Sequence, residues 1–309
     1  MSREVKLFTG NNTRDLSEKI AYIYGKPLGK STSEKFSDGE LSYNYDESVR
    51  GCHVFLIQST CPPSDNIIEL LLMIDAARRA SAQYVTLVVP YFGYGRQDRK
   101  DKPRVSIAAK LFADVLTAVG ADRLMTCDLH AGQIQGFFDI PVDHLDGSYI
   151  FFPYLETLNL DNMIFASPDV GGVTRTRAYA KHFAVEMVVC DKHRKRANEI
   201  ASMQIIGDVN GKDVILIDDL IDTGGTMCRA ANLIKEKGAK SVRAVCTHAV
   251  LSGNAYENIE NSVLEELVVT DTLPLRKPSS KIKVLTVADL LAKAIRKVHN
   301  HESISSLFV

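Results

Sequence analysis

The chain has 309 residues, of which 45% are hydrophobic and 24% are charged, and its formal net charge is −1. The length exceeds the usual size of one domain and favours two domains of about 150 residues, while the apolar content excludes a disordered chain. The near-neutral charge argues against a nucleic-acid-binding protein, and clusters of Lys and Arg at 96–104 and 192–196 favour local anionic ligands, which we expect to be phosphates.

The sequence shows no sign of a membrane or export segment. Its start, Met1 to Leu7, is charged, and no stretch reaches the roughly 18 apolar residues that span a bilayer. None of the six cysteines has the CxxC spacing that is typical of a metal site. We therefore expect a cytoplasmic protein whose thiols are reduced and mostly buried, among them Cys52, Cys127, Cys190 and Cys246.

Short apolar runs alternate with amphipathic segments in the first half of the chain, which predicts repeated strand–helix units. Fully apolar strands with short connections are typical of a parallel sheet covered by helices on both faces, and ligands of such sheets gather at the carboxyl ends of the strands. The expected elements are strand 53–58, helix 67–80, strand 84–89, helix 107–119 and strand 123–127.

The same alternation restarts after Asp146, where we place a domain boundary. We expect two tandem α/β domains, 1–146 and 147–286, each with a doubly wound parallel sheet, and a C-terminal helix and tail, 287–309, packed on the first domain. The expected elements are helix 148–158, strand 163–166, helix 172–182, strands 186–190 and 213–217, helix 225–237, strands 242–246 and 282–285, and helix 287–298.

The strongest chemical signal is an apolar strand that ends in two carboxylates and a Gly-rich turn into a helix, VILIDDLIDTGGT at 214–226. The glycines permit close approach to the backbone, and the turn amides and helix N-terminus suit a monophosphate. Asp218 and Asp219 stand where they could grip two ribose hydroxyls, and Thr223 and Thr226 add hydroxyl donors. An acidic turn before a capped helix is the alternative, which the preceding IDD disfavours. These thirteen residues resemble the phosphoribosyl-diphosphate-binding signature of the type I phosphoribosyltransferase fold.

Two further motifs follow predicted strands. YFGYGRQDR at 91–99 offers a guanidinium and an amide for a nucleotide and its phosphates, although a solvated loop is an equal alternative from spacing alone. CDLH at 127–130 ends a strand with a carboxylate and an imidazole two residues apart. His130 could hold a divalent ion, but a single histidine is more often structural and is an uncommon ligand for Mg²⁺.

Taken together, the motifs are similar to those of the phosphate-activated class of ribose-phosphate diphosphokinases. The resemblance extends over nearly the whole chain and rests on FSDGE (36–40), YFGYGRQDRK (91–100), CDLHAGQIQGFFDIPVDHL (127–145), SPDVGG (167–172), DKHR (191–194) and VILIDDLIDTGGT (214–226). It implies an enzyme that moves the β,γ-diphosphoryl group of ATP to C1 of ribose 5-phosphate, giving phosphoribosyl diphosphate and AMP.

The resemblance implies a role for each matching residue. The implied catalytic residues are Lys192 and Arg194, on a mobile loop. The implied ATP-binding residues are Phe36, Asp38, Gly39, Glu40, Arg96, Gln97, Asp98 and Arg99. Of these, Phe36, Asp38 and Glu40 would reach the adenosine of a neighbouring subunit. Ribose 5-phosphate is bound by Arg194, Asp218, Asp219, Asp222, Thr223, Gly224, Gly225 and Thr226, and Mg²⁺ by His130 and Asp169 with Asp128 close by. A basic run such as KHRKR at 192–196, taken alone, is more often a solvated or nucleic-acid-binding surface.

The resemblance further implies regulation by phosphate and ADP in a homo-oligomer of six chains. The matching effector-site residues are Arg50, Arg79, Lys100, Lys102, Arg104, Ser303, Ser305 and Phe308. Two other functions share part of the pattern. A phosphoribosyltransferase shares the 214–226 segment but leaves the first 146 residues unexplained, and a catalytically silent regulatory homologue is disfavoured because Lys192, Arg194, His130 and Asp169 are all present.

Overall fold

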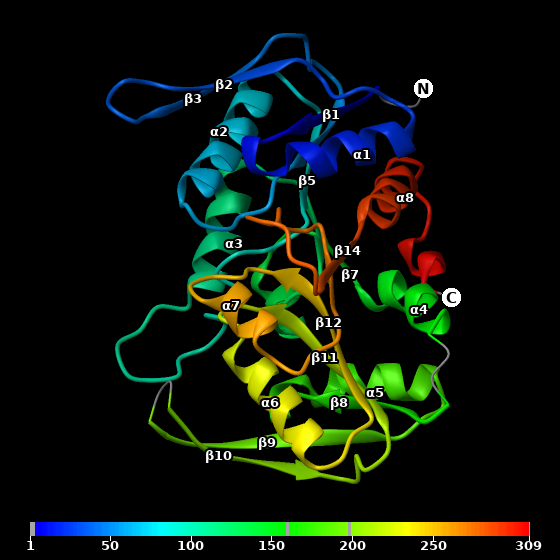
Figure 1. The fold of residues 1–309 in the computed structure, drawn as a ribbon. Helices are drawn as coiled ribbons and strands as arrows, with labels where there is room; N and C mark the ends of the chain where they lie inside the picture. Colours follow the sequence, from blue (N-terminus) through cyan, green and yellow to red (C-terminus); the bar gives the residue numbers. More distant parts are fainter. Residues whose placement is uncertain (1–3, 159–160, 197–198, 309) are drawn as a thin grey trace. The chain divides into compact units, whose positions relative to one another are not determined.

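The computed structural model describes residues 4–158, 161–196 and 199–308, and for 192–196 and 199–202 it describes the backbone alone. The chain divides into two compact units (Figure 1). The first unit consists of Met1–Gly147, Thr272–Pro274 and Thr286–Val309, and the second of Ser148–Asp271 and Leu275–Leu285. The chain therefore visits the first unit briefly at 272–274 before it returns there at 286.

The first unit is built on a parallel sheet with the strand order β1-β4-β5-β6-β7. Its strands are β1 (Val5–Thr9), β4 (His53–Ile57), β5 (Tyr84–Val89), β6 (Arg123–Cys127) and β7 (Val142–Leu145). A parallel bridge between Leu7 and Leu28 adds the segment that follows the first helix to the free side of β1. The order therefore reverses at β1, which makes the sheet doubly wound.

Helices and a hairpin complete the first unit. They are η1 (Asn11–Thr13), α1 (Arg14–Tyr24), hairpin β2 (Ser31–Lys35) and β3 (Leu41–Tyr45), α2 (Asp65–Arg79), α3 (Ala108–Val119), η2 (Gly132–Phe137), α8 (Ala288–His299) and η4 (Ile304–Leu307). The C-terminal helix α8 packs on α1, as Figure 1 shows, and Arg296 Nη2 donates hydrogen bonds to the carbonyls of Ile23 and Tyr24, where α1 ends. The last carbonyls of a helix have no partner within the helix, and a cation such as Arg296 stabilises them.

The second unit is built on a sheet with the order β10-β9-β8-β11-β12-β13-β14. Its strands are β8 (Met163–Ser167), β9 (Met187–Arg196), β10 (Glu199–Ile206), β11 (Asp213–Ile221), β12 (Ser241–Ala249), β13 (Leu267–Thr270) and β14 (Ile282–Leu285). Its helices are α4 (Ser148–Glu156), η3 (Val170–Gly172), α5 (Val173–His182), α6 (Gly225–Glu236) and α7 (Ala255–Glu260). Because β9 and β11 lie on opposite sides of β8, the order reverses there, as it does at β1 in the first unit.

Alternate residues of the second sheet enter different cores. Val214 and Leu216 of β11 pack with residues of α6 and α7, whereas Ile215 and Ile217 pack with aromatic residues of α4 and α5 such as Phe151. Both faces of the strand are therefore removed from water, which is why its sequence reads as a continuous apolar run. The predicted α/β class with parallel sheets is confirmed.

Two local expectations were wrong, and several elements were not expected from the sequence. The strand expected at 213–217 continues to Ile221, because β12 pairs with it as far as Ala249, so Asp218 and Asp219 lie within β11. The strand expected to end at 190 continues to Arg196 and pairs with β10 in an antiparallel hairpin with two register shifts, in place of a loop. The hairpin β2–β3 was not predicted at all.

The structure also bears on the expectations for cysteines and membranes. All six cysteines are free thiols, and the four that the sequence predicts to be buried are buried. Within the described residues, no helix combines the length and the apolar character needed to cross a membrane.

Candidate active site

The carboxylates of Asp218 and Asp219 on β11 lie near the guanidinium of Arg175 on α5. The backbone N–H of Asp219 donates to Oδ1 of Asp218 at 2.9 Å, and Arg175 Nη1 of α5 lies 3.4 Å from Oδ1 of Asp219. Burial raises the pKa of Asp218 well above its usual range, the charges of Asp219 and Asp169 raise it further, and Arg175 opposes them. Carboxylates from two strands therefore gather near Arg175 at this end of the sheet, and carboxylate oxygens accept from hydroxyl donors and bind cations.

Asp169 comes from the neighbouring strand. It follows β8, and its Oδ1 accepts a hydrogen bond of 3.2 Å from the N–H of Gly172, which caps the short helix η3. A Cβ at Gly172 would lie 2.7 Å from Oγ of Ser167, so only glycine fits the close packing of this turn. Because β8 and β11 are the parallel neighbours at which the strand order reverses, Asp169 and Asp218 border the crevice where ligands of such sheets bind.

The Gly-rich turn connects β11 to α6. Gly224 has φ +75° and α6 begins at Gly225, so the turn needs the left-handed conformation that glycine adopts without strain. Thr223 is exposed, and Thr226 in the first helical turn is half-buried. The amides at the start of a helix carry a partial positive charge and have no partner within the helix, so the turn is suited to a phosphate.

In the first unit, the structure brings together the two motifs that follow β5 and β6. Gln133 Nε2 donates a 3.0 Å hydrogen bond to Oδ2 of Asp98, and a Cβ at Gly95 would lie 3.7 Å from Cβ of His130. Arg96 and Gln97 are exposed beside them. The predicted ATP-binding residues of the segment 96–99 and the predicted imidazole ligand His130 therefore lie close together, in a solvent-accessible part of this unit.

A residue that sequence reasoning missed supports the end of β6. His144 of β7 accepts a 3.0 Å hydrogen bond at Nε2 from the N–H of Leu129, next to Asp128. Asp128 is buried and has φ +41°, and its N–H donates to the carbonyl of Leu145 at 3.0 Å. Nothing in the sequence pointed to this role, because no strand was expected at 142–145 and the pairing of β7 with β6 brings His144 to this position.

The tip of the β2–β3 hairpin carries four predicted ATP-binding residues. Asp38 Oδ1 accepts from the N–H of Glu40 at 3.0 Å, the N–H of Gly39 donates to the carbonyl of Phe36 at 2.9 Å, and Gly39 has φ +99°. Phe36 is 53% exposed, so its ring is accessible to a ligand or a partner chain. The predicted contact of this tip with a neighbouring subunit stays a prediction.

Other predicted residues lie elsewhere or outside the described part. The backbone of Lys192 and Arg194 belongs to β9, and their side chains lie outside the described residues. In the first unit, Arg50 Nη1 donates to Oγ of Ser81 at 3.1 Å and Arg79 Nε to Oδ2 of Asp75 at 2.7 Å. The remaining effector-site residues stay predictions: Lys100, Lys102 and Arg104 in the exposed loop between β5 and α3, and Ser303, Ser305 and Phe308 in or beside η4.

The predicted metal ligands come from different units. His130 and Asp128 lie in the first and Asp169 in the second. Among the described residues, no three or more His, Cys, Asp and Glu side chains form a group with metal-binding geometry. The assignment of His130, Asp128 and Asp169 as ligands therefore stays a prediction.

Comparison with known proteins identifies the family. Residues 5–120 match the N-terminal domain of ribose phosphate pyrophosphokinase, and residues 167–309 match the phosphoribosyl synthetase-associated domain. The chain is 56% identical over 303 residues to a ribose-phosphate pyrophosphokinase of Porphyromonas gingivalis, covering 98% of this chain and 97% of that protein. It is 54% identical over 308 residues to one of Campylobacter jejuni, covering 99% and 100%.

A solved structure agrees with this result. The crystal structure of phosphoribosylpyrophosphate synthetase from Mycobacterium smegmatis matches with a TM-score of 0.92 at 39% identity, covering 97% of this chain and 100% of that one. The expected resemblance to ribose-phosphate diphosphokinases, the same enzymes under another name, is confirmed. With a doubly wound sheet, a carboxylate pair and a Gly-rich turn at the predicted positions and relatives that match from end to end, the chain belongs to the ribose-phosphate pyrophosphokinase family.

Proposed function

We propose that the chain transfers the β,γ-diphosphoryl group of ATP to the C1 hydroxyl of ribose 5-phosphate and releases AMP and phosphoribosyl diphosphate. The observation that carries the proposal is the crevice at β8 and β11, where Asp218 and Asp219 precede a Gly-rich turn at a helix N-terminus. A sugar monophosphate needs acceptors for its hydroxyls and N–H donors for its phosphate, and this crevice offers both. The end-to-end identity with ribose-phosphate pyrophosphokinases supports the same reaction.

In the proposed reaction, the C1 oxygen of the sugar bonds to the β-phosphorus of ATP while the bond from that phosphorus to the α,β-bridging oxygen breaks. AMP leaves with that oxygen, and the hydroxyl proton passes to solvent, since no residue here is assigned as its base. Asp218 and Asp219 orient the ribose hydroxyls, and the turn 222–226 binds the 5-phosphate. Arg96 and Gln97 bind the nucleotide, while Lys192 and Arg194 stabilise the charge of the transferred group.

A divalent cation fits the residues at these strand ends. Asp218 and Asp219 on β11, with the pKa of Asp218 raised by burial and by its neighbours, and Asp169 supply oxygen ligands of the kind that Mg²⁺ prefers. We propose His130 and Asp169, with Asp128 nearby, as the residues that hold Mg²⁺. When bound, it neutralises phosphate oxygens of ATP.

Assembly and regulation complete the proposal. A homohexamer would let Phe36, Asp38 and Glu40 reach the nucleotide of a neighbouring chain. Phosphate and ADP would act at the residues Arg50, Arg79, Lys100, Lys102, Arg104, Ser303, Ser305 and Phe308. The basic side chains of this set, several of them on an exposed loop, suit an anionic effector.

The test is the formation of AMP by the purified chain with Mg-ATP, in the presence and absence of ribose 5-phosphate. AMP that depends on the sugar phosphate supports diphosphoryl transfer. A folded chain that binds ribose 5-phosphate and forms no AMP at any phosphate concentration would be a silent regulatory homologue instead.

A further inference from the structure

Three consecutive carbonyls of the sugar-phosphate turn are tied to one neighbouring segment. The N–H of Leu251 donates to the carbonyl of Ile221 at 3.1 Å, and the N–H of Ser252 donates to that of Asp222 at 3.0 Å. Asn258 of α7 donates from Nδ2 to the carbonyl of Thr223 at 2.8 Å. The segment from the end of β12 through α7 therefore holds the turn residue by residue.

These bonds determine where the amides of the turn point. In a planar trans peptide the C=O and N–H groups point in opposite directions. Carbonyls fixed toward the β12–α7 segment thus aim the N–H groups of Asp222, Thr223 and Gly224 away from it. Successive N–H groups aimed to one side form a concave site for an anion.

The third bond differs from the other two because it is made by a side chain. The carbonyl of Thr223 and the N–H of Gly224 share one peptide, and Gly224, with φ +75°, has the left-handed conformation that glycine adopts without strain. The helix that carries Asn258 and the residues just after it are themselves held by hydrogen bonds to residues 276–281. The hydroxyl of Tyr256 accepts from the N–H groups of Arg276 and Lys277 at 3.1 and 3.4 Å, and Lys281 Nζ donates to the carbonyl of Ser262 at 2.7 Å.

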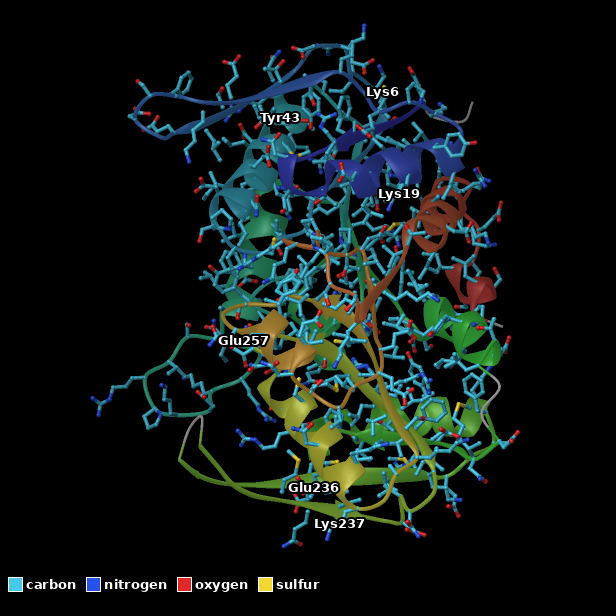
Figure 2. The ribbon with its side chains drawn as sticks, viewed as in Figure 1. Lys6, Lys19, Tyr43, Glu236, Lys237 and Glu257 are labelled. Carbon is cyan, nitrogen blue, oxygen red and sulfur yellow. The ribbon has the colours of Figure 1, made fainter. Side chains whose placement is uncertain are left out.

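We infer that Asn258 is a positioning residue for the 5-phosphate of the sugar substrate. It acts by holding the peptide between Thr223 and Gly224, whose N–H group contributes to the anion site. This inference rests on the proposed function, because it takes the turn 222–226 to be the phosphate cradle. Glu257, labelled in Figure 2, marks the position of α7 next to this turn.

The test compares Asn258→Ala with Asn232→Ala by titration calorimetry with ribose 5-phosphate alone. Asn232 on α6 is a matched control, because its Oδ1 accepts a 3.3 Å hydrogen bond from the N–H of Val263, next to the end of α7 and not in the turn. We expect Asn258→Ala to weaken binding about three- to tenfold, the range for one lost hydrogen bond, and Asn232→Ala to leave it unchanged. The KM for ribose 5-phosphate should rise in parallel while the KM for ATP stays the same.

Each other outcome has a defined meaning. Unchanged binding by Asn258→Ala overturns the inference, and so does an equal loss in both variants, because packing of α6 and α7 would then explain it. A wild-type chain that does not bind ribose 5-phosphate contradicts the proposed function itself, and the inference with it. Thermal unfolding of both variants shows whether each is folded before titration.

Discussion

The two sheets reverse their strand order in the same way, yet their crevices at the reversal differ. In the second unit, the crevice between β8 and β11 is bordered by Asp169, Asp218 and a Gly-rich turn. In the first unit, the corresponding position between β1 and β4 is filled by the buried side chain of Gln58. A Cβ at Gly10 would collide with that side chain, which leaves little space for a ligand.

A hydrogen-bond network holds this side chain in place. Gln58 Nε2 donates to Oε2 of Glu69 at 2.8 Å, and the hydroxyl of Thr13 donates to Oε1 of Gln58 at 3.2 Å. The candidate ATP residues of this unit follow β5 and β6 instead, where Arg96 and Gln97 are exposed. In both units the topology provides a place for a ligand at the strand reversal, and the side chains at the strand ends decide whether a ligand can bind there.

The largest effect should come from outside both crevices. Lys192 is expected to stabilise the transferred group from the β9–β10 hairpin, so Lys192→Ala should lower kcat by about 10² to 10³, the loss seen when one donor to a developing charge is removed. Lys237→Ala, at the end of α6 and labelled in Figure 2, is the control for loss of a lysine and should keep full activity. Steady-state AMP formation measures both; equal activity of the two variants would refute the role of Lys192.

The second-unit crevice is tested by Asp219→Asn. This variant removes a charged acceptor from the proposed sugar site, and hydrogen bonds to charged groups are the stronger kind, so the KM for ribose 5-phosphate should rise by about 10- to 100-fold. Glu236→Gln on α6, also labelled in Figure 2, makes the same kind of change on an exposed side chain and should have no effect. If only the KM for ATP rose, Asp219 would belong to the nucleotide site and not to the sugar site.

Arg96→Ala is the corresponding test of the first unit. Loss of one charge-assisted contact to a phosphate should raise the KM for ATP about tenfold and leave that for ribose 5-phosphate unchanged. Arg14→Ala on α1 is the control, because Arg14 is exposed and its ion pair with Glu18, at 3.7 Å, spans one helical turn of the surface. An unchanged KM for ATP in Arg96→Ala would mean that Arg96 does not contribute to ATP binding.

Gln58, which fills the crevice between β1 and β4, should contribute to the stability of the fold and not to substrate binding. Gln58→Ala leaves Glu69, which is 3% exposed, without one of its donors, so the free energy of unfolding should fall by about 1 to 3 kcal/mol. Denaturant unfolding measures this loss. Both KM values should remain those of the wild type; a selective rise in either would mean that this crevice takes part in binding.

Much of the fold could be predicted because buried parallel strands leave a clear pattern. The bounds of β5, β6 and β14 are those expected, since each is flanked by polar residues or, after β5, by Pro90. The β2 strand, STSEK, could not be predicted, because its residues are largely exposed and no apolar alternation marks it. The length of β11 likewise depends on its pairing with β12, which a local pattern does not show.

For the candidate site, the sequence predicted the residues within contiguous motifs but not the residues that support them. Residues in contiguous motifs, such as Asp218 to Thr226, could be located because their neighbours in sequence are also their neighbours in space. Residues that support them could not be located. His144, Gln58 and Asn258 act through contacts with distant segments, because their bonds to Leu129, Thr13 and Thr223 join residues 15, 45 and 35 positions apart in the sequence.

The most direct test of diphosphoryl transfer is phosphorus NMR of the products formed from Mg-ATP and ribose 5-phosphate. We expect a sugar that carries a diphosphoryl group at C1, formed in equal amount with AMP. ADP with a sugar bisphosphate, or orthophosphate without a new sugar product, would contradict diphosphoryl transfer by this chain.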